Sequence, residues 1–302
     1  MNLPCSLTSR RRKMNGFTLV EAVMVIVITG IIAGVVAVFI VSPVKGYADS
    51  VKRAELTDAA DVVIRRFARD VHLALPNSLR VKDSSGNVGS CAPQPSVTCY
   101  IELIMTSAGG RYRYATTDGS TGGNSLNFTT ATLTFDAMGP MPTFPSIVAN
   151  DYVVVYNLGP GYAPADAYAT GDPCSNCNRA KVSSTSGNTI ILASNPFVGQ
   201  SPSPNNSFQV IPGGVKAVTY ACPTTTPGNL TRYWNYGFNP NLSTTPSGTS
   251  ALLASGITCV VAPYSTTNSA SKGILSITFM LTDPTSGESV TLFRQVNVDN
   301  VP

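Results

Sequence analysis

The residues best placed to do chemistry lie near the N-terminus, at Gly16, Phe17 and Glu21. Glu21 is the single charged residue in the 25-residue stretch from Phe17 to Val41. A carboxylate in an apolar helix costs a few kcal/mol to insert into a membrane, so a functional role is the first interpretation to test. If the Gly16–Phe17 bond is cut, the new amine of Phe17 lies one helical turn from Glu21. The amine of one copy could then pair with Glu21 of a neighbour, offsetting the burial of both charges and fixing their stagger.

Outside this segment the chain offers few groups for catalysis. His72 is the only histidine, so histidine-rich metal sites are excluded and one candidate histidine base remains. We expect His72 to lie beside Asp70 on the solvated side of a helix. The sequence contains no phosphate-binding glycine loop, nucleophile elbow or HExxH motif. We therefore expect no enzyme, no cofactor and no metal ion; Asp118, Gly119 and Asn124 offer too few ligands for calcium.

Six of the seven cysteines form three short-range pairs, and the seventh, Cys5, lies in the basic N-terminal region. An even set in a chain with an export signal indicates disulfides formed in an oxidising compartment. Six cysteines allow 15 pairings. We expect pairing between neighbours: Cys91 with Cys99, Cys174 with Cys177, and Cys222 with Cys259.

Cys174 and Cys177 form a CxxC motif, a spacing that also occurs in redox enzymes. A redox site would need a helix N-terminus directly after a strand. Here Asp172-Pro173 precedes the motif and a Ser/Thr-rich loop follows it, so we interpret the pair as a structural disulfide. A zinc site that adds Cys222 and Cys259 is the alternative, and the oxidising location disfavours it.

The formal net charge of +4 comes entirely from the N-terminus, where residues 10–13 are all basic and no acidic residue precedes Glu21. A cut after Gly16 leaves 16 basic and 16 acidic residues. The mature chain would then be neutral, which gives no support for a nucleic-acid-binding surface. Basic residues before an apolar span place the N-terminus in the cytoplasm and the rest of the chain across the membrane.

The apolar stretch predicts a transmembrane helix. At about 1.5 Å per residue, a helix from Phe17 to Val41 is about 37 Å long, enough to cross a hydrocarbon core of about 30 Å. Its many Val and Ile residues favour strand, but backbone groups inside lipid must be satisfied within the segment, which favours helix. A cleaved secretory signal would have about 7–15 apolar residues and a small-residue cleavage site. Instead Ser42-Pro43-Val44-Lys45 follows.

The run Gly16-Phe17-Thr18-Leu19-Val20-Glu21 resembles the type IV prepilin signature. The resemblance implies cleavage after Gly16 and N-methylation of Phe17 by a prepilin peptidase at the cytoplasmic face of the bacterial inner membrane. It also implies that Glu21 contacts the Phe17 amine of an adjacent subunit during assembly. The implied partners are other pilins, through this helix, and an inner-membrane assembly platform.

The helix should continue beyond the membrane span after an interruption. Pro43 lacks a backbone donor and should kink the helix or melt it locally. The prepilin resemblance also places a helix breaker in this region. Beyond it, apolar residues recur at helical spacing, and we expect the helix to end before Pro76. The apolar stripe comprises Ala60, Val63, Ile64, Phe67, Val71, Ala74 and Leu75. The opposite side should carry two i,i+4 ion pairs, Asp61–Arg65 and Arg66–Asp70.

Two segments carry a narrower resemblance. Residues 46–81 and the C-terminal sequence QVNVDNVP (295–302) resemble the minor pilins of the MSHA (mannose-sensitive haemagglutinin) pilus, of the MshO type. The middle of the chain supports this only through its composition.

Beyond residue 77 the pattern changes to short β-like runs. We predict strands at 97–106, 126–135, 152–156, 189–193, 215–221 and 232–236, and surface loops at 200–207 and 223–249. A hairpin should end the chain, with a turn at TDPTSGE between two alternating apolar runs. These runs comprise Leu275, Ile277, Phe279 and Leu281, then Val290, Leu292, Val296 and Val298. Its apolar face should pack on the helical stripe.

We therefore expect an α+β, type IV pilin-like fold: a long helix packed on an antiparallel sheet with long, disulfide-tied loops. The expected parts are a cleaved leader (1–16), a pilin helix (17–75, transmembrane at 17–41 and amphipathic at 44–75) and a periplasmic or extracellular β domain (76–302). The expected function is a minor pilin or pseudopilin, in low copy at pilus initiation or at the tip. A type II secretion pseudopilin is one alternative. A tip adhesin that uses the aromatic segment 233–236 is another, although sheet core is the simpler interpretation of that segment.

Overall fold

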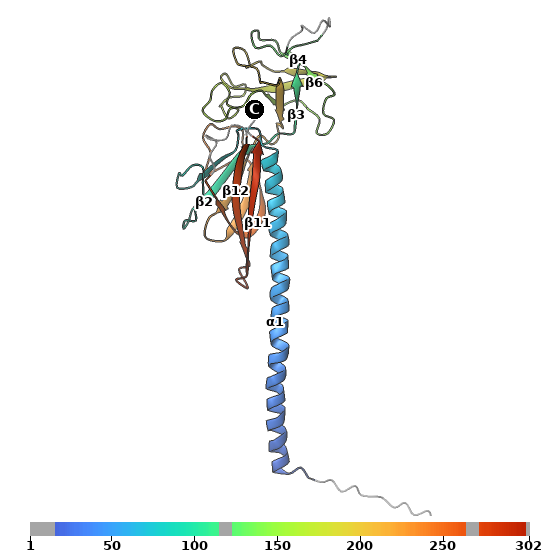
Figure 1. Ribbon diagram of the computed structural model, residues 1–302, viewed down its shortest axis with the longest axis vertical. Coiled ribbons are helices and arrows are strands. Elements are labelled where there is room, and N and C mark those ends of the chain that lie inside the picture. The colour runs from blue at the N-terminus through green and yellow to red at the C-terminus, as the bar shows by residue number, and fades with distance from the viewer. Residues whose placement is uncertain (1–15, 115–122, 264–271, 300–302) are drawn as a thin grey trace, which may run out of the picture. The chain divides into compact units, whose positions relative to one another are not determined.

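The computed structural model describes residues 16–114, 123–263 and 272–299, and the following applies to those ranges (Figure 1). The protein is of mixed α+β class, with one long helix followed by strands that all pair antiparallel. This agrees with the predicted type IV pilin-like class. The chain divides into two compact units, residues 1–52 and residues 53–302.

Helix α1 (Leu19–His72) runs through both units as one continuous element. Its described residues in the first unit are almost all exposed, although most of them up to Val41 are apolar. The helix continues through Pro43, so the local melting that we considered at this proline is absent. A kink at Pro43 remains a prediction.

The last turns of α1 carry the expected apolar stripe. Ala60, Val63, Ile64, Phe67 and Val71 are all buried, and the helix ends before Pro76 as predicted. Arg69 and His72 lie in the last turn, where cations interact favourably with the helix dipole.

The stripe packs on a seven-stranded sheet, whose strands lie beside these turns in Figure 1. In spatial order the strands are β1 (Arg80–Asp83), β2 (Thr98–Ile104), β9 (Ala217–Pro223), β10 (Gly228–Trp234), β11 (Thr249–Val261), β12 (Lys272–Thr282) and β13 (Ser289–Asp299). Strands β12 and β13 are the predicted C-terminal hairpin, paired along their whole length.

Aromatic side chains fill the centre of the helix–sheet core. Phe67 of α1 makes edge-to-face contacts with Tyr220 of β9 and Phe279 of β12, at centroid distances of 5.0 and 5.7 Å. Such pairs contribute beyond the area that they bury. The prediction that the hairpin packs on the helical stripe is confirmed.

A second β structure is inserted between the neighbouring strands β2 and β9. It is a closed barrel in the order β3 (Ala108–Tyr112), β4 (Thr134–Met138), β7 (Thr189–Leu192), β6 (Arg179–Ser186), β5 (Tyr152–Val154) and β8 (Ser207–Ile211). It has its own apolar core, which includes Phe135, Phe197 and Phe208. The sequence pattern predicts strands in this region but not a separate closed barrel.

Several predicted strands coincide with observed ones, and others do not. The strand predicted at 126–135 is wrong except for its last two residues, which begin β4, because residues 126–133 are irregular. The loop predicted at 223–249 is also wrong in part, since it contains β10. Strands β1, β3, β6, β8 and β11 were not predicted.

The six cysteines outside the N-terminal region form three disulfides: Cys91–Cys99, Cys174–Cys177 and Cys222–Cys259. Cys222 on β9 and Cys259 on β11 lie on the two strands that flank β10. Because the four cysteines of the alternative zinc site are bonded in two separate disulfides, that alternative is wrong.

Candidate functional site

The segment that carries the candidate cleavage bond lies just outside α1. Residues 16–18 are not helical, Phe17 is 71% exposed, and a side chain at Gly16 would meet nothing within 4 Å. The fold of this chain therefore does not require glycine at position 16. A requirement for it would have to come from another molecule that acts on this bond.

The sequence around Glu21 also starts the helix. Thr18 is the N-cap: its hydroxyl accepts a hydrogen bond from the Glu21 amide at 3.2 Å, and its carbonyl accepts one from Ala22 at 3.1 Å. Glu21 is therefore the third helical residue, the position that an acidic residue takes in a capping box. Its negative charge also interacts favourably with the N-terminal end of the helix dipole.

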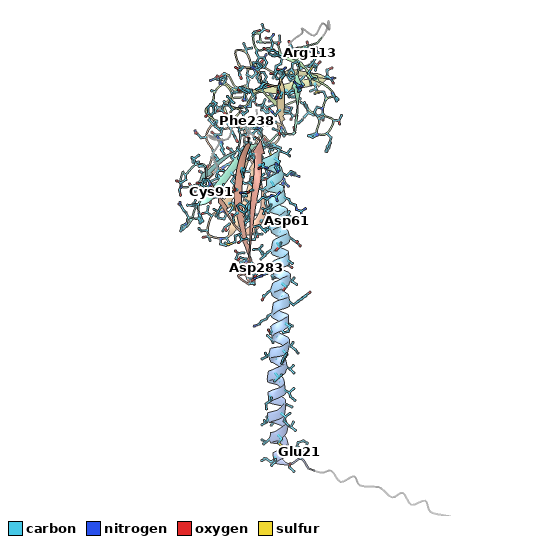
Figure 2. The ribbon with its side chains drawn as sticks, viewed as in Figure 1. Glu21, Asp61, Cys91, Arg113, Phe238 and Asp283 are labelled. Carbon is cyan, nitrogen blue, oxygen red and sulfur yellow. A yellow bond between two sulfur atoms is a disulfide. The ribbon has the colours of Figure 1, made fainter. Side chains whose placement is uncertain are left out.

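The Glu21 side chain is exposed, and in the described part of the chain it has no ion pair or side-chain hydrogen bond (Figure 2). Thr29, the next polar side chain, bonds instead to the carbonyl of Val25 within its own helix at 2.6 Å. Glu21 is thus the group in this apolar stretch that is available to another chain.

Helix α1 is long and apolar enough to cross a membrane, judged by length and composition. None of its most apolar stretch is buried within the described chain. An apolar surface of this extent requires cover by lipid or by other helices.

Comparison with known proteins identifies the same segment. Residues 11–37 match the family described as the prokaryotic N-terminal methylation motif. The chain carries a type IV prepilin-like signal. No curated protein and no solved structure matches the chain. The signal supports a pilin- or pseudopilin-type structural subunit that a prepilin peptidase processes and that assembles with other pilins.

Outside the prepilin-like signal, Asp70 lies inside the protein and not on the solvated side of the helix. The predicted Arg66–Asp70 pair on the solvated side is wrong, because Asp70 is fully buried. Its Oδ2 accepts hydrogen bonds from the Tyr220 hydroxyl at 2.7 Å and from Arg232 Nε at 2.8 Å. Asp70 lies three residues after Phe67, on the apolar side, and this spacing could have identified it. The other predicted pair, Asp61–Arg65, is present at 2.6 Å.

His72 is exposed at the end of α1. Asp118 and Gly119, considered above for calcium, lie outside the described residues. In the described ranges no three His, Cys, Asp or Glu residues are grouped so that they could hold a metal ion.

A buried polar network missed by the sequence analysis lies on the sheet face opposite α1. Glu102 of β2 is 1% exposed and pairs with Arg80 of β1, and its Oε1 accepts a hydrogen bond from the Tyr236 hydroxyl at 2.8 Å. Arg80 also donates to the carbonyls of Asn239 and Pro240, both at 2.6 Å. Burial raises the pKa of Tyr236, and the Glu102 carboxylate raises it further. The network fixes the β10–β11 loop (residues 235–248) to the sheet.

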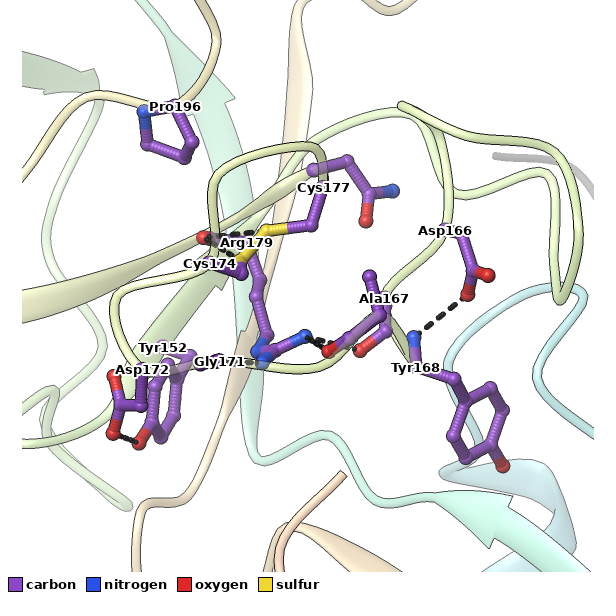
Figure 3. The surroundings of a disulfide bond; sticks show 12 residues. Tyr152, Asp166, Ala167, Tyr168, Gly171, Asp172, Cys174, Cys177, Arg179 and Pro196 are labelled. Atoms are coloured by element: carbon purple, nitrogen blue, oxygen red, sulfur yellow. Dashed lines mark hydrogen bonds between the residues drawn. A yellow bond between two sulfur atoms is a disulfide. The ribbon is translucent and has the colours of Figure 1, made fainter. Parts of the chain in front are cut away.

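A second cluster surrounds the Cys174–Cys177 disulfide (Figure 3). Arg179 of β6 donates to the carbonyls of Ala167 at 2.9 Å and Ala169 at 2.7 Å, and lies 4.0 Å from the centre of the Phe238 ring. Burial lowers the pKa of Arg179 to about 10, so it stays charged at neutral pH. Both sulfur atoms of the disulfide lie 3.4 Å from the Arg179 carbonyl and both cysteines are buried, which agrees with a structural role.

Proposed function

We propose that this chain is a minor pilin or pseudopilin that is cut between Gly16 and Phe17, N-methylated at Phe17, and assembled into a filament. Exposed Glu21 carries the proposal, because it is the single charge in the apolar stretch 17–41 and has no side-chain partner among the described residues. After cleavage the Phe17 amine of a neighbouring copy supplies one. In an apolar surrounding such a pair offsets the desolvation of both groups and fixes the axial register.

The finer assignment follows the resemblance to MSHA-pilus minor pilins. We assign the chain a low-copy role in pilus initiation or at the tip. Before assembly it is anchored in the bacterial inner membrane by residues 17–41, with the basic residues 10–13 in the cytoplasm and residues 76–302 in the periplasm. A type II secretion pseudopilin has the same physical features, and the genes beside this one would distinguish the two.

N-terminal mass spectrometry of the protein from its native host tests the proposed processing. We expect a chain that starts at N-methylated Phe17. A chain that keeps Met1, or one cut beyond Val41, contradicts the proposal.

Substitution of Glu21 tests the register role separately. Glu21→Ala should still be cleaved, because the scissile bond is unchanged, but should enter filaments poorly. Thr29→Ala, which removes a polar group already satisfied inside the helix, is the matched control and should assemble normally. Normal assembly of Glu21→Ala would contradict the register role.

A further inference from the structure

The sheet face opposite α1 carries a groove beside the β10–β11 loop. Side chains alternate along a strand, so those next to the core residues of β2, β9 and β10 point away from the helix. The groove has a volume of about 560 Å³, within the range of sites for small ligands. Its lining includes Tyr100, Tyr233, Thr231, Ala221, Asn229 and Thr244.

Strand register explains the shape of this groove. Tyr100 of β2 lies opposite Ala221 of β9, which in turn lies opposite Thr231 of β10. Ala221 has a small side chain, so the surface of the sheet is recessed between the side chains of Tyr100 and Tyr233. Burial raises the pKa of Tyr100 and the nearby Tyr233 phenol raises it further, which agrees with their proximity. Because the groove floor is formed by paired strands, its aromatic side chains project from a rigid base.

The far wall of the groove is also held in place. Thr244, Thr245 and Pro246 of the β10–β11 loop line it. The same loop is fixed to the sheet by Tyr236, whose hydroxyl bonds both Glu102 and Thr219. The wall therefore exists before any ligand arrives.

The lining is uncharged and rich in hydrogen-bonding groups. No Asp, Glu, Lys or Arg is among the described residues that line it. In the described part of the chain, the side chains of Asn229, Thr231, Tyr233 and Thr244 make no hydrogen bond to the protein. A phosphate or carboxylate would find no cation here, and a purely apolar ligand would bury these polar groups without giving them hydrogen-bond partners.

We propose that this groove binds a neutral carbohydrate. The electron-rich faces of Tyr100 and Tyr233 suit the C–H face of a sugar ring. The threonine hydroxyls and the asparagine amide suit its hydroxyl groups, which both donate and accept. Assembly depends on the N-terminal segment and binding on this groove, so the two proposals can fail independently.

An array of immobilised neutral and sialylated oligosaccharides, probed with the full chain in a detergent without sugar groups, tests the proposal. We expect binding to neutral glycans only. Tyr233→Ala and Tyr100→Ala should each weaken it by about tenfold or more, the scale expected for loss of one stacked aromatic contact. Tyr233→Phe keeps the ring and should retain most of the binding.

Tyr162→Ala is the matched control, because Tyr162 is an exposed tyrosine that lines a different pocket, on the loop after β5. It should bind as the unmodified chain does. Thermal unfolding of each variant shows whether the fold is retained, and Thr231→Val tests a hydroxyl without removing a ring.

Three outcomes would overturn the proposal. These are no glycan binding, binding that Tyr162→Ala abolishes but Tyr233→Ala does not, and binding only to sialylated glycans. In the first of these outcomes, binding of a proline-rich peptide would identify the alternative ligand, since aromatic grooves of another type recognise such peptides.

Discussion

Two aspartates of α1 show how position on a helix determines the effect of one carboxylate. Asp61 pairs with Arg65 at the surface, and both side chains are largely exposed to water. Asp70 pairs with Arg232 inside the protein, where the two side chains are 1% and 8% exposed. Loss of one partner from a buried pair leaves an uncompensated charge in a medium that solvates it poorly.

Asp70→Ala should therefore reduce the free energy of unfolding by about 3–5 kcal/mol, the usual cost of breaking a buried pair. Urea unfolding followed by fluorescence can measure this, because Trp234 is the single tryptophan and packs against the core. Asp61→Ala is the control and should give no measurable change. Equal effects of the two substitutions would contradict a buried role for Asp70.

Asp83 should make stability depend on pH in acid. Burial acts to raise its pKa, but hydrogen bonds from the Asn87 side chain and from the backbone of Asn87, Ser85 and Gly86 outweigh burial and lower it below the ordinary 3.8. The ionised form therefore stabilises the fold above pH 3.8, and this contribution is lost as pH falls through the lower, folded-state value. As the pH falls from about 5 to 2, the thermal stability of Asp83→Asn should decrease less than that of the unmodified chain, as thermal unfolding across this range would show. Asn87→Ala, which removes one donor, should reproduce part of the change.

At the scale of elements, one loop connects a core network to a surface groove. The β10–β11 loop lies on the sheet face opposite α1 and is held by contacts to Arg80 and Glu102. The aromatic residues at the end of β10 and the start of this loop have separate roles. Tyr233 lines the groove, Trp234 packs on the helix–sheet core, and Tyr236 belongs to the polar network. A substitution of Trp234 would therefore test packing of the helix–sheet core, whereas a substitution of Tyr233 tests ligand binding in the groove.

Tyr236→Phe should loosen this loop without unfolding the sheet. It removes a hydrogen bond to a charged group, a contribution of about 1.5–3 kcal/mol. We expect faster hydrogen exchange at residues 235–248 while β2 and β9 stay protected, as mass spectrometry would show. Tyr162→Phe, at an exposed tyrosine, should leave hydrogen exchange unchanged both in residues 235–248 and in β2 and β9. Unchanged exchange in the loop would show that Tyr236 does not hold it.

Periodicity predicted the elements whose apolar residues repeat over many positions. The helical stripe and the C-terminal hairpin are of this kind, with 3.6- and 2-residue repeats along one buried face. The barrel was not predicted because its closure depends on pairing between strands that lie far apart in the chain, such as β3 with β8 and β4 with β7, which periodicity does not reveal. Asp70 was misplaced because its four-residue spacing from Arg66 was given more weight than its three-residue spacing from Phe67. The Arg80–Glu102–Tyr236 network joins residues far apart in the chain, which local patterns do not show.

At the scale of the whole molecule, the described cores belong to one of the two units. The buried residues of the helix–sheet core, the barrel core and the cluster that joins them all lie between Ala60 and Val298. Residues 19–52 contribute none of them. The stretch that is long and apolar enough to cross a membrane and the residues that pack on the sheet therefore lie in different parts of one continuous helix.

A chain that begins at Arg53 should therefore fold alone in an oxidising compartment. Its thermal midpoint should lie within about 2 °C of the full chain's, since no core residue is lost. A chain that begins at Pro76 lacks the helical stripe and should not fold cooperatively. Circular dichroism of both proteins measures this, and a folded chain from Pro76 would show that the stripe is dispensable.

The position of Phe279 has a consequence for biosynthesis. Phe67 leaves the ribosome long before β12, whose Phe279 packs against it. Contacts between such distant segments form slowly, and until then the stripe exposes apolar surface. The nascent chain therefore exposes this apolar surface until β12 has been translated. A premature stop before β12 would leave this apolar surface permanently exposed and make the product a target for proteolysis.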